Sequence, residues 1–208
     1  MLRMAEAKIW EKPVSHGEIL KTIWKNLDLG TLDRNHPFHT PVFGTIADNE
    51  PNLRIVVLRR FWRRPPQLAF HAHGGSPKIA ELRANPNVYW LFYHPQEKLQ
   101  VRVKGIATIH VDGELHEEQW LATELFSRRC YVGEPPTHES KRPTTGLPAD
   151  LINRKPTHEE SELGKANFVV VTSTIDSIDC FELNAKGHRR SLFEWHENGE
   201  LCTKWLTP

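Results

Sequence analysis

Cysteine is scarce in this sequence, and no two cysteines are close enough to form a paired motif. Three occur in 208 residues, at Cys130, Cys180 and Cys202. An odd number at such wide spacing argues against a disulfide framework, and without a Cys-x-x-Cys pair a zinc ribbon is not expected either. This use of cysteine is typical of a reducing compartment, so we expect a cytoplasmic protein.

Long apolar runs are missing as well. No stretch approaches the roughly 20 apolar residues that a helix needs to cross a membrane. The first residues, Met1–Glu6, lack the apolar core of a secretory signal. The sequence therefore predicts no membrane partner.

Glycine-rich nucleotide motifs and an excess of one charge are also absent. Neither G-x-G-x-x-G nor the Walker sequence occurs, which excludes the Rossmann and P-loop types of nucleotide site. The 27 basic and 26 acidic residues leave a net charge of +1, so no general attraction to nucleic acid is expected. The run Arg59–Arg64 is basic and aromatic, as in some nucleic-acid-binding surfaces. We interpret it instead as a strand end with solvated arginines.

Length and composition favour one globular domain. Hydrophobic residues make up 38% of the chain and charged residues 25%, proportions that allow a filled core. We expect a single domain over residues 1–208, with its core in residues 38–110 and 168–208. Residues 132–167 are rich in proline and charge and show little periodicity, apart from a helical turn expected at 147–151. We interpret them as an ordered excursion that packs over a ligand or a second subunit, with a floppy loop as the alternative.

Periodicity predicts a mainly β chain with peripheral helices. A capping box at Ser15–Glu18 starts a first amphipathic helix, and a second is expected at 114–126. Segments with β-type patterns predict strands at residues 38–47, 54–59, 67–73, 87–93, 99–105, 168–174, 177–183, 189–196 and 201–206. Turns are expected at 48–51, 63–66 and 197–200. Gly105 marks a bulge or a barrel corner, and the whole suits a small, mostly antiparallel barrel.

The stretch Gly74–Lys78 carries the clearest chemical signal. Two glycines precede Ser76 at the N-cap position and Pro77 at the first helical position. The predicted helix, residues 77–84, ends before Asn85-Pro86 because proline disfavours helix at the residue before it. A helix N-terminus carries unpaired N–H groups and a partial positive charge, so it attracts anions such as phosphate.

The cations near this helix support the same interpretation. Lys78 lies in the first turn, where a positive charge opposes the helix dipole unless an anion is bound. Arg54 and Arg59 come from a neighbouring predicted strand. An ordinary capped surface helix with solvated charges is the alternative. We favour a phosphate site.

Four motifs follow one another along the stretch from Arg54 to Gly105. They read Arg54-Ile-Val-Val-Leu-Arg59, Leu68-Ala-Phe-His-Ala72, Ser76-Pro-Lys78 before a helix ending at Asn85-Pro86, and Leu99-Gln-Val-Arg-Val-Lys-Gly105. In order and spacing they resemble the pyridoxamine 5'-phosphate oxidase-like, FMN-binding split-barrel family. The likeness is close from Leu53 to Ile109 and looser toward the C-terminus. It is closer to a subgroup whose own reaction is poorly defined than to the biosynthetic oxidase.

The resemblance implies a mainly β split barrel with flanking helices, FMN as cofactor, and a homodimer with the flavin at the subunit interface. By this resemblance the cofactor contacts are Arg54, Val56, Val57, Arg59, His71, Ala72, Ser76, Lys78, Gln100 and Arg190. Arg190 would reach the flavin from the partner chain. The candidates for substrate contact are Arg128, His188 and Arg189. No catalytic residue and no metal ligand are assigned.

Several residues depart from the family's pattern. Where the family usually reads Ser-Arg-Lys, this chain has Ser76-Pro77-Lys78, so one phosphate cation is missing. The biosynthetic oxidase has lysine where Arg59 stands, and Phe181 replaces its late tryptophan. Its Arg-Leu-His-Asp-Arg run becomes His188–Ser191. These changes are compatible with FMN binding, and they leave pyridoxamine phosphate as one substrate among several.

Three hypotheses from different classes follow. The first is an FMN-dependent oxidoreductase that takes a hydride from a small amine, an alcohol such as pyridoxine 5'-phosphate, or a nicotinamide donor, with oxygen or another acceptor. The second is a flavin- or haem-binding module without turnover, and the sequence leaves open whether a deazaflavin replaces FMN. The third is a small barrel that binds oligonucleotides through Arg59–Arg64. The near-neutral net charge counts against the third, so no nucleic-acid partner is expected.

Overall fold

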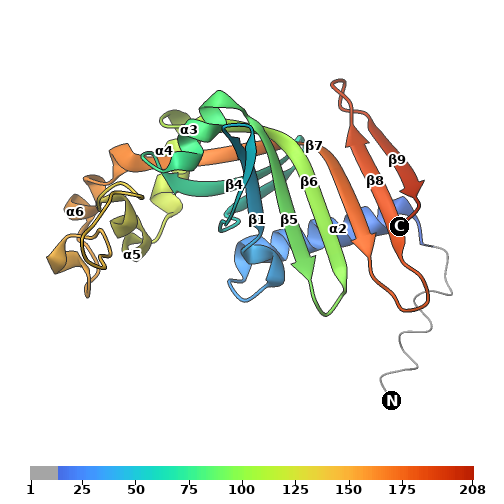
Figure 1. Cartoon of the computed structure of the whole chain (residues 1–208), viewed down its shortest axis with the longest axis horizontal. Helices are drawn as coiled ribbons and strands as arrows, with labels where there is room; N and C mark the ends of the chain where they lie inside the picture. Colours follow the sequence, from blue (N-terminus) through green and yellow to red (C-terminus); the bar gives the residue numbers. More distant parts are fainter. Residues whose placement is uncertain (1–13) are drawn as a thin grey trace, which may run out of the picture.

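The computed structural model describes residues 14–208, in which nine strands form one antiparallel sheet with helices around it (Figure 1). The strands are β1 (Val42–Ala47), β2 (Glu50–Ile55), β3 (Arg60–Arg63), β4 (Pro66–His73), β5 (Asn87–His94), β6 (Leu99–His110), β7 (Phe168–Glu182), β8 (Arg189–Trp195) and β9 (Leu201–Leu206). The α-helices are α2 (His16–Leu32), α3 (Pro77–Ala84), α4 (Gly113–Ala122), α5 (Leu125–Arg128) and α6 (His158–Glu162). The 3-10 helices are η1 (Pro37–His39), η2 (Arg129–Tyr131), η3 (Ala149–Leu151) and η4 (Lys165–Asn167). The fold is mainly β, as predicted.

Helix α2 begins with the predicted capping box. The backbone N–H of Glu18 donates to Ser15 Oγ at 3.2 Å, and the Ser15 N–H donates to Glu18 Oε2 at 2.9 Å. The reciprocal pair satisfies two of the helix's free N–H groups. Ile19, Ile23 and Leu27 then face the core and are at most 4% exposed. The prediction of an amphipathic first helix is confirmed.

The strand predicted at 54–59 is wrong in its bounds. Asp48 and Asn49 both have positive φ, 50° and 67°, which suits the tight two-residue turn of a hairpin. The return strand β2 therefore already begins at Glu50 and ends at Ile55. It is an edge strand, so it tolerates Pro51, which has no N–H to donate.

Residues 56–59 close the barrel without forming a regular strand. The Val56 N–H donates to Pro41 O and the Leu58 N–H to His39 O, at 3.1 and 2.8 Å, while the Arg59 N–H donates to Ala69 O at 2.8 Å. The segment thus joins the β1 end of the sheet to β4. The predicted first strand is shorter than expected for a related reason, because residues 37–39 form η1 and β1 starts only at Val42.

The two strands predicted at 168–174 and 177–183 are one continuous strand, β7. It pairs with β6 along most of its length, whereas on its other side residues 168–174 pair with β4 and residues 177–182 pair with β8. The register against β6 passes from Lys104↔Ser177 to Gly105↔Ile175, so Asp176 has no opposite residue. This is the β-bulge predicted at Gly105. The sheet forks at that point.

Gly105 is expected to be essential for the bulge. A Cβ at this position would lie 2.2 Å from the carbonyl oxygen of Thr174. Gly105→Ala must therefore push the β6 and β7 backbones apart and lose ladder hydrogen bonds, at a cost of about 3 kcal/mol of unfolding free energy or more. Urea unfolding followed by circular dichroism measures this loss.

The matched control is Gly17→Ala in α2. There the added methyl would meet nothing closer than Ser15 Oγ at 3.9 Å, so alanine should stabilise the helix by up to about 1 kcal/mol. Equal unfolding midpoints for the two variants would contradict the role given to Gly105.

A second apolar cluster lies beneath α4 on the other side of β4 and β7. It contains Ala69, Trp120, Tyr131, Phe168 and Val170. The helix predicted at 114–126 is wrong in its length, because α4 ends at Ala122 and α5 is a separate turn. The expected turn at 147–151 is η3, and the excursion also carries α6 and η4.

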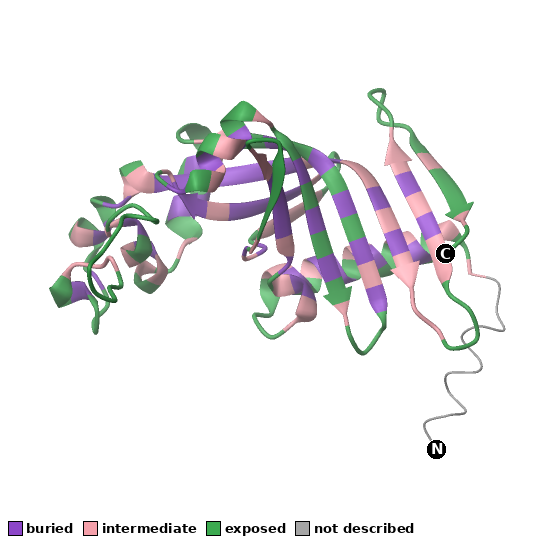
Figure 2. Ribbon diagram, viewed as in Figure 1, coloured by how far each residue is buried: buried purple, intermediate pink, exposed green. Residues whose placement is uncertain are grey.

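The outward face of β1, β2, β5 and β6 is unusually apolar for a surface. Burial alternates along β5 and β6, so that every second residue faces outward (Figure 2). The exposed apolar residues of this face are Leu53, Ile55, Tyr89, Leu91, Tyr93 and Ile106, between 38% and 68% exposed. We call these six residues the outer apolar face.

Of the helices between residues 14 and 208, none combines the length and apolar character required to span a bilayer.

Candidate functional site

The N-terminus of α3 forms a cradle of polar groups. Ser76 stands at the N-cap position and is 5% exposed, as the sequence predicts. Its hydroxyl does not cap the helix, however, but accepts a hydrogen bond from Lys78 Nζ at 2.5 Å. The first N–H groups of α3 therefore have no side-chain partner. Lys78 is folded back over the end of the helix.

Arg54 reaches this cradle from β2. Its Nη2 donates to Glu81 Oε2 at 2.7 Å, and its Nη1 donates to the hydroxyl of Thr45. Burial lowers the pKa of Lys78, and the nearby charge of Arg54 lowers it further. Two cations thus share a single carboxylate, so the cradle keeps a positive charge in excess.

Glu81 balances part of that charge. Burial acts to raise its pKa, but hydrogen bonds from Thr45, Arg54 and Asn52 outweigh burial and hold the pKa below its ordinary value. Glu81 is therefore ionised near neutral pH. Sequence reasoning missed both Glu81 and Thr45, because only the fold brings β1, β2 and α3 together.

The loop between β4 and α3 is held from two sides. The Gly75 N–H donates to His73 Nδ1 at 3.0 Å, and the Gly74 N–H donates to the carbonyl of Asn167 at 2.7 Å. A Cβ at Gly75 would lie 3.0 Å from Cβ of Pro135, so the excursion packs directly on the loop. Burial lowers the pKa of His73, which keeps Nδ1 available as an acceptor. His73 is a third residue that the sequence analysis did not select.

The other predicted cofactor residues near the cradle lie in the 56–59 segment and in β4. Val56 is buried, and Ala72 is buried in β4. His71 points to α4, where its Nε2 lies 3.2 Å from Gln119 Oε1. Burial lowers the pKa of His71 to about 4, and the charge of Arg59 acts in the same direction. His71 is therefore neutral at pH 7.

This neutral histidine should make stability depend on pH. The unfolded chain binds a proton at His71 below about pH 6.5, whereas the folded chain resists protonation down to about pH 4. Stability is therefore present above pH 6.5 and is lost as the pH falls. The loss from this group is about 2 kcal/mol between pH 7 and pH 5.

Urea unfolding of the wild type and of His71→Gln at these two pH values tests this contribution. The non-titrating variant should lose less stability on acidification than the wild type. Identical losses would show that His71 titrates normally.

A second group of predicted residues lies on the β6–β7–β8 side of the sheet. Gln100 pairs with Phe181, which pairs with Arg190, so the three occupy one row across the strands. Arg190 donates to Asp179 through Nε at 3.1 Å and Nη2 at 2.8 Å. Asp179 also accepts a hydrogen bond from Arg102. Gln100 and Arg190 are thus presented on a common face.

The substrate candidates divide between two places. Arg189 forms a two-pronged ion pair with Glu182 at 3.0 and 2.9 Å, and the ring of His188 lies 5.3 Å from that of Phe181. Arg128 lies elsewhere, 4% exposed, and stacks 4.6 Å over Trp120. Its guanidinium donates to the carbonyls of Thr123 and Leu121 and to Glu162. Arg128 therefore holds the α4–α5 junction together.

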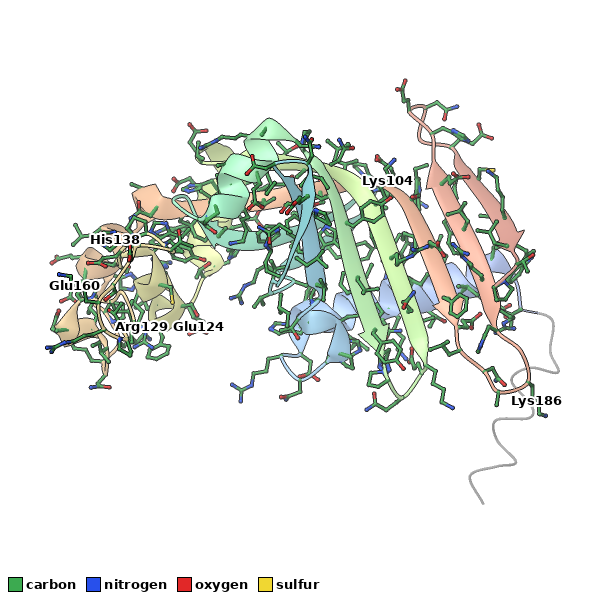
Figure 3. The ribbon with its side chains drawn as sticks, in the orientation of Figure 1. Lys104, Glu124, Arg129, His138, Glu160 and Lys186 are labelled. Atoms are coloured by element: carbon green, nitrogen blue, oxygen red, sulfur yellow. The ribbon has the colours of Figure 1, made fainter. Side chains whose placement is uncertain are left out.

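The residues around the start of α3 and those on the β6–β7–β8 side of the sheet are far apart within one chain. Helix α3 lies at one end of β5 and β6, and the hairpin after β5 lies at the other (Figure 1). Lys186, in the loop between β7 and β8, is also remote from α3 (Figure 3). The predicted site residues of the chain thus fall into two separate groups, which we call the first and the second partial site.

The residues of the first partial site lie in a segment that matches a known family. Residues 19–111 match the family model described as the pyridoxamine 5'-phosphate oxidase, FMN-binding domain. Over this segment the chain resembles the FMN-binding family. The matched residues include Arg54, Ser76 and Lys78, and FMN is the cofactor of the matched domain.

Curated relatives agree with this assignment. The chain is 25% identical over 173 residues to the pyridoxine/pyridoxamine 5'-phosphate oxidase of Psychrobacter cryohalolentis, covering 78% of this chain and 75% of the relative. It is 34% identical over 95 residues to the same-named protein of Nitrobacter winogradskyi, covering 46% of this chain but only 42% of the relative.

Solved structures share the fold. One is a pyridoxamine 5'-phosphate oxidase-related, FMN-binding protein from Nostoc punctiforme, with a TM-score of 0.71 and 18% identity over 95% of this chain and 100% of the other. Another is PhzG from Burkholderia lata in complex with tetrahydrophenazine-1-carboxylic acid, with a TM-score of 0.69 and 16% identity over 95% of each chain. At these identities the likeness establishes the split-barrel fold alone.

Proposed function

We propose that this protein is an FMN-dependent oxidoreductase that acts as a homodimer on a small amine or alcohol. The observation that carries the proposal is the cradle of Arg54, Ser76 and Lys78 at the start of α3. It has an excess of positive charge, a buried hydroxyl and helix N–H groups without side-chain partners. Helix N–H groups, a hydroxyl and cationic side chains are groups that bind a phosphate monoester.

The position of Lys78 supports the phosphate assignment. A cation in the first turn opposes the helix dipole, and burial beside Arg54 lowers its pKa further. A bound phosphate dianion would offset both costs. Pro77 stands where the family usually has arginine, so Arg54 and Lys78 carry a larger share of phosphate binding here.

The other residues have separate tasks in this proposal. When bound, FMN supplies a hydride acceptor, while the chain binds and orients it. The segment Val56–Arg59 and the β4 pair His71 and Ala72 would line the ring edge. Because His71 stays neutral, Arg59 is the charged group of this set. Gln100 and Arg190 would complete the pocket.

The proposed dimer follows from the separation of the two partial sites. Gln100 and Arg190 stand at the starts of β6 and β8, whereas α3 lies at the other end of β5 and β6 (Figure 1), so we assign the two groups to different subunits of one flavin site. The outer apolar face exposes six large apolar side chains on β2, β5 and β6, and a large exposed apolar patch marks an interaction surface. A second subunit covering this face would place its own Gln100 and Arg190 against the first subunit's cradle.

For the substrate we propose pyridoxamine or pyridoxine 5'-phosphate, or a related small amine or alcohol, with O2 as acceptor. The names of the curated relatives support this class. His188 and Arg189 lie beside Phe181 in the second partial site and remain our candidates for substrate contact. Arg128 would have to release two backbone carbonyls to bind a substrate, so we rank it third.

The decisive experiment is the visible absorption spectrum of the purified protein, before and after adding FMN and desalting. Flavin bands that survive desalting establish the cofactor in solution. Anaerobic addition of pyridoxamine 5'-phosphate, pyridoxine 5'-phosphate or NADH then shows which donor bleaches those bands. A protein that releases FMN on desalting would refute the proposal. One that retains FMN but is reduced by none of the donors would be a binding module.

A further inference from the structure

The fork in the sheet opens a cavity that lies away from the cradle. It has a volume of about 670 Å³ and lies between α2, the β3–β4 turn, the middle of β7 and the β8–β9 hairpin. This volume is within the range of roughly 300–1,000 Å³ that small-molecule sites occupy. None of the residues assigned to FMN or substrate lines it. The cavity is therefore a separate place on the molecule.

Two indole rings form its apolar wall. Trp24 from α2 and Trp195 from β8 both line the cavity, with ring centroids 5.9 Å apart, and Leu20 and Leu201 add aliphatic surface. Both tryptophans are only half-buried. Phe61 supports Trp24 from behind, at 4.9 Å between centroids. The wall is thus rigid, aromatic and accessible.

Asp176, the bulged residue of β7, lines the same cavity. A bulge commonly redirects a side chain at a functional position. The Asp176 carboxylate is half-buried, yet it forms no hydrogen bond or ion pair with any residue in the range 14–208. Burial raises its pKa, and the charge of Lys104 on β6 only partly offsets this. An unpaired carboxylate that lines an open cavity is available to a cationic ligand.

The charges at the rim favour a cationic ligand. Arg63 and Arg64 are both exposed on the β3–β4 turn, but Arg63 is already paired with Asp28. The lining then holds one further guanidinium, that of Arg64, against the carboxylates of Asp176 and Glu197. Among the lining side chains that have no ion-pair partner within residues 14–208 the net charge is therefore negative, and Lys104, which acts on Asp176 from β6, is not part of the lining. Indole faces also attract cations rather than anions.

We propose that this cavity is a second small-molecule site, which binds a protonated organic amine with a flat, apolar body. The ammonium group pairs with Asp176, and the body packs against Trp24 and Trp195. The site is independent of FMN binding and of the reaction proposed above. It lies next to the fork that joins the two halves of the sheet, so its occupancy also stabilises the folded chain.

A series of three probes on the unaltered FMN-loaded protein tests the charge preference. Benzylamine, benzyl alcohol and benzoate share one ring and differ in charge at pH 7. Isothermal titration calorimetry should show benzylamine binding at least about tenfold more tightly than benzyl alcohol, and benzoate more weakly than both. Benzoate binding as tightly as benzylamine, or no binding of benzylamine, would overturn the proposal.

Two variants then locate the site. Asp176→Asn keeps the side-chain shape and should weaken benzylamine binding at least about tenfold while leaving benzyl alcohol unchanged. The matched control is Asp112→Asn, which removes an exposed carboxylate that makes no side-chain capping bond. Both variants should retain FMN. Equal benzylamine affinity in the wild type and Asp176→Asn would place the binding elsewhere. Even if a variant failed to fold, tight benzoate binding or the absence of benzylamine binding in the probe series would still overturn the proposal.

Discussion

The double substitution Arg54→Ala and Lys78→Ala is expected to abolish stable FMN binding. Each side chain offers a charge-assisted hydrogen bond to the proposed phosphate position, and each such bond contributes about 1.5–3 kcal/mol. One substitution should therefore raise the Kd for FMN about 10- to 100-fold. The two together should raise it about 100-fold at the least. Flavin fluorescence quenching on titration into the apoprotein measures both constants.

A matched control separates the local cradle from general electrostatics. Arg154→Ala with Lys204→Ala removes the same total charge from exposed ion pairs with Glu160 and Glu194. This control should bind FMN as the wild type does. Riboflavin, which lacks the phosphate, should bind the wild type and the cradle variant equally. If the cradle variant retained FMN on desalting, the phosphate would have to bind elsewhere.

Leu91→Arg is expected to convert the protein into a monomer that does not hold FMN. Leu91 is 38% exposed at the centre of the outer apolar face, between β1 and β6. A guanidinium buried there without a partner would cost several kcal/mol of association energy. Because each cradle would then lack the partner's Gln100 and Arg190, FMN affinity should fall together with the dimer. Light scattering coupled to gel filtration gives the mass.

Leu121→Arg provides the comparison. This leucine is 71% exposed on α4, away from the outer apolar face, so the same chemical change should leave both the mass and the flavin content unaltered. A Leu91→Arg protein that stays dimeric would place the interface elsewhere. A monomeric one with full FMN content would show that one chain suffices for the cofactor.

Local signals in the sequence predicted an element correctly where neighbouring residues alone determine its bounds. Helix α3 has the predicted bounds because Ser76-Pro77 starts it and Asn85-Pro86 ends it. The strand predicted at 54–59 has the wrong bounds because its local pattern does not show which way its side chains face. Leu53 and Ile55 look like core residues in sequence, but they face outward on the edge strand β2. A pattern cannot distinguish apolar residues that face the core from those that face a partner.

The sequence predicted the cations of the cradle but not the residues that hold them and the neighbouring loop in place. Arg54, Ser76 and Lys78 carry visible signals: a helix start, and charges next to it. Glu81 and His73 carry none, because their importance depends on β2 and the excursion lying against α3. Such contacts between distant segments depend on tertiary structure, which composition and periodicity do not encode.

The fork at β7 has a consequence for the order in which the chain can be assembled during synthesis. Strands β4 and β6 are complete by residue 110, yet each needs β7, residues 168–182, as its second neighbour. Until the ribosome has released those residues, both strands have unpaired edges that can pair with other chains. The matched segment 19–111 therefore cannot complete its own barrel. It must wait for a strand encoded more than fifty residues downstream.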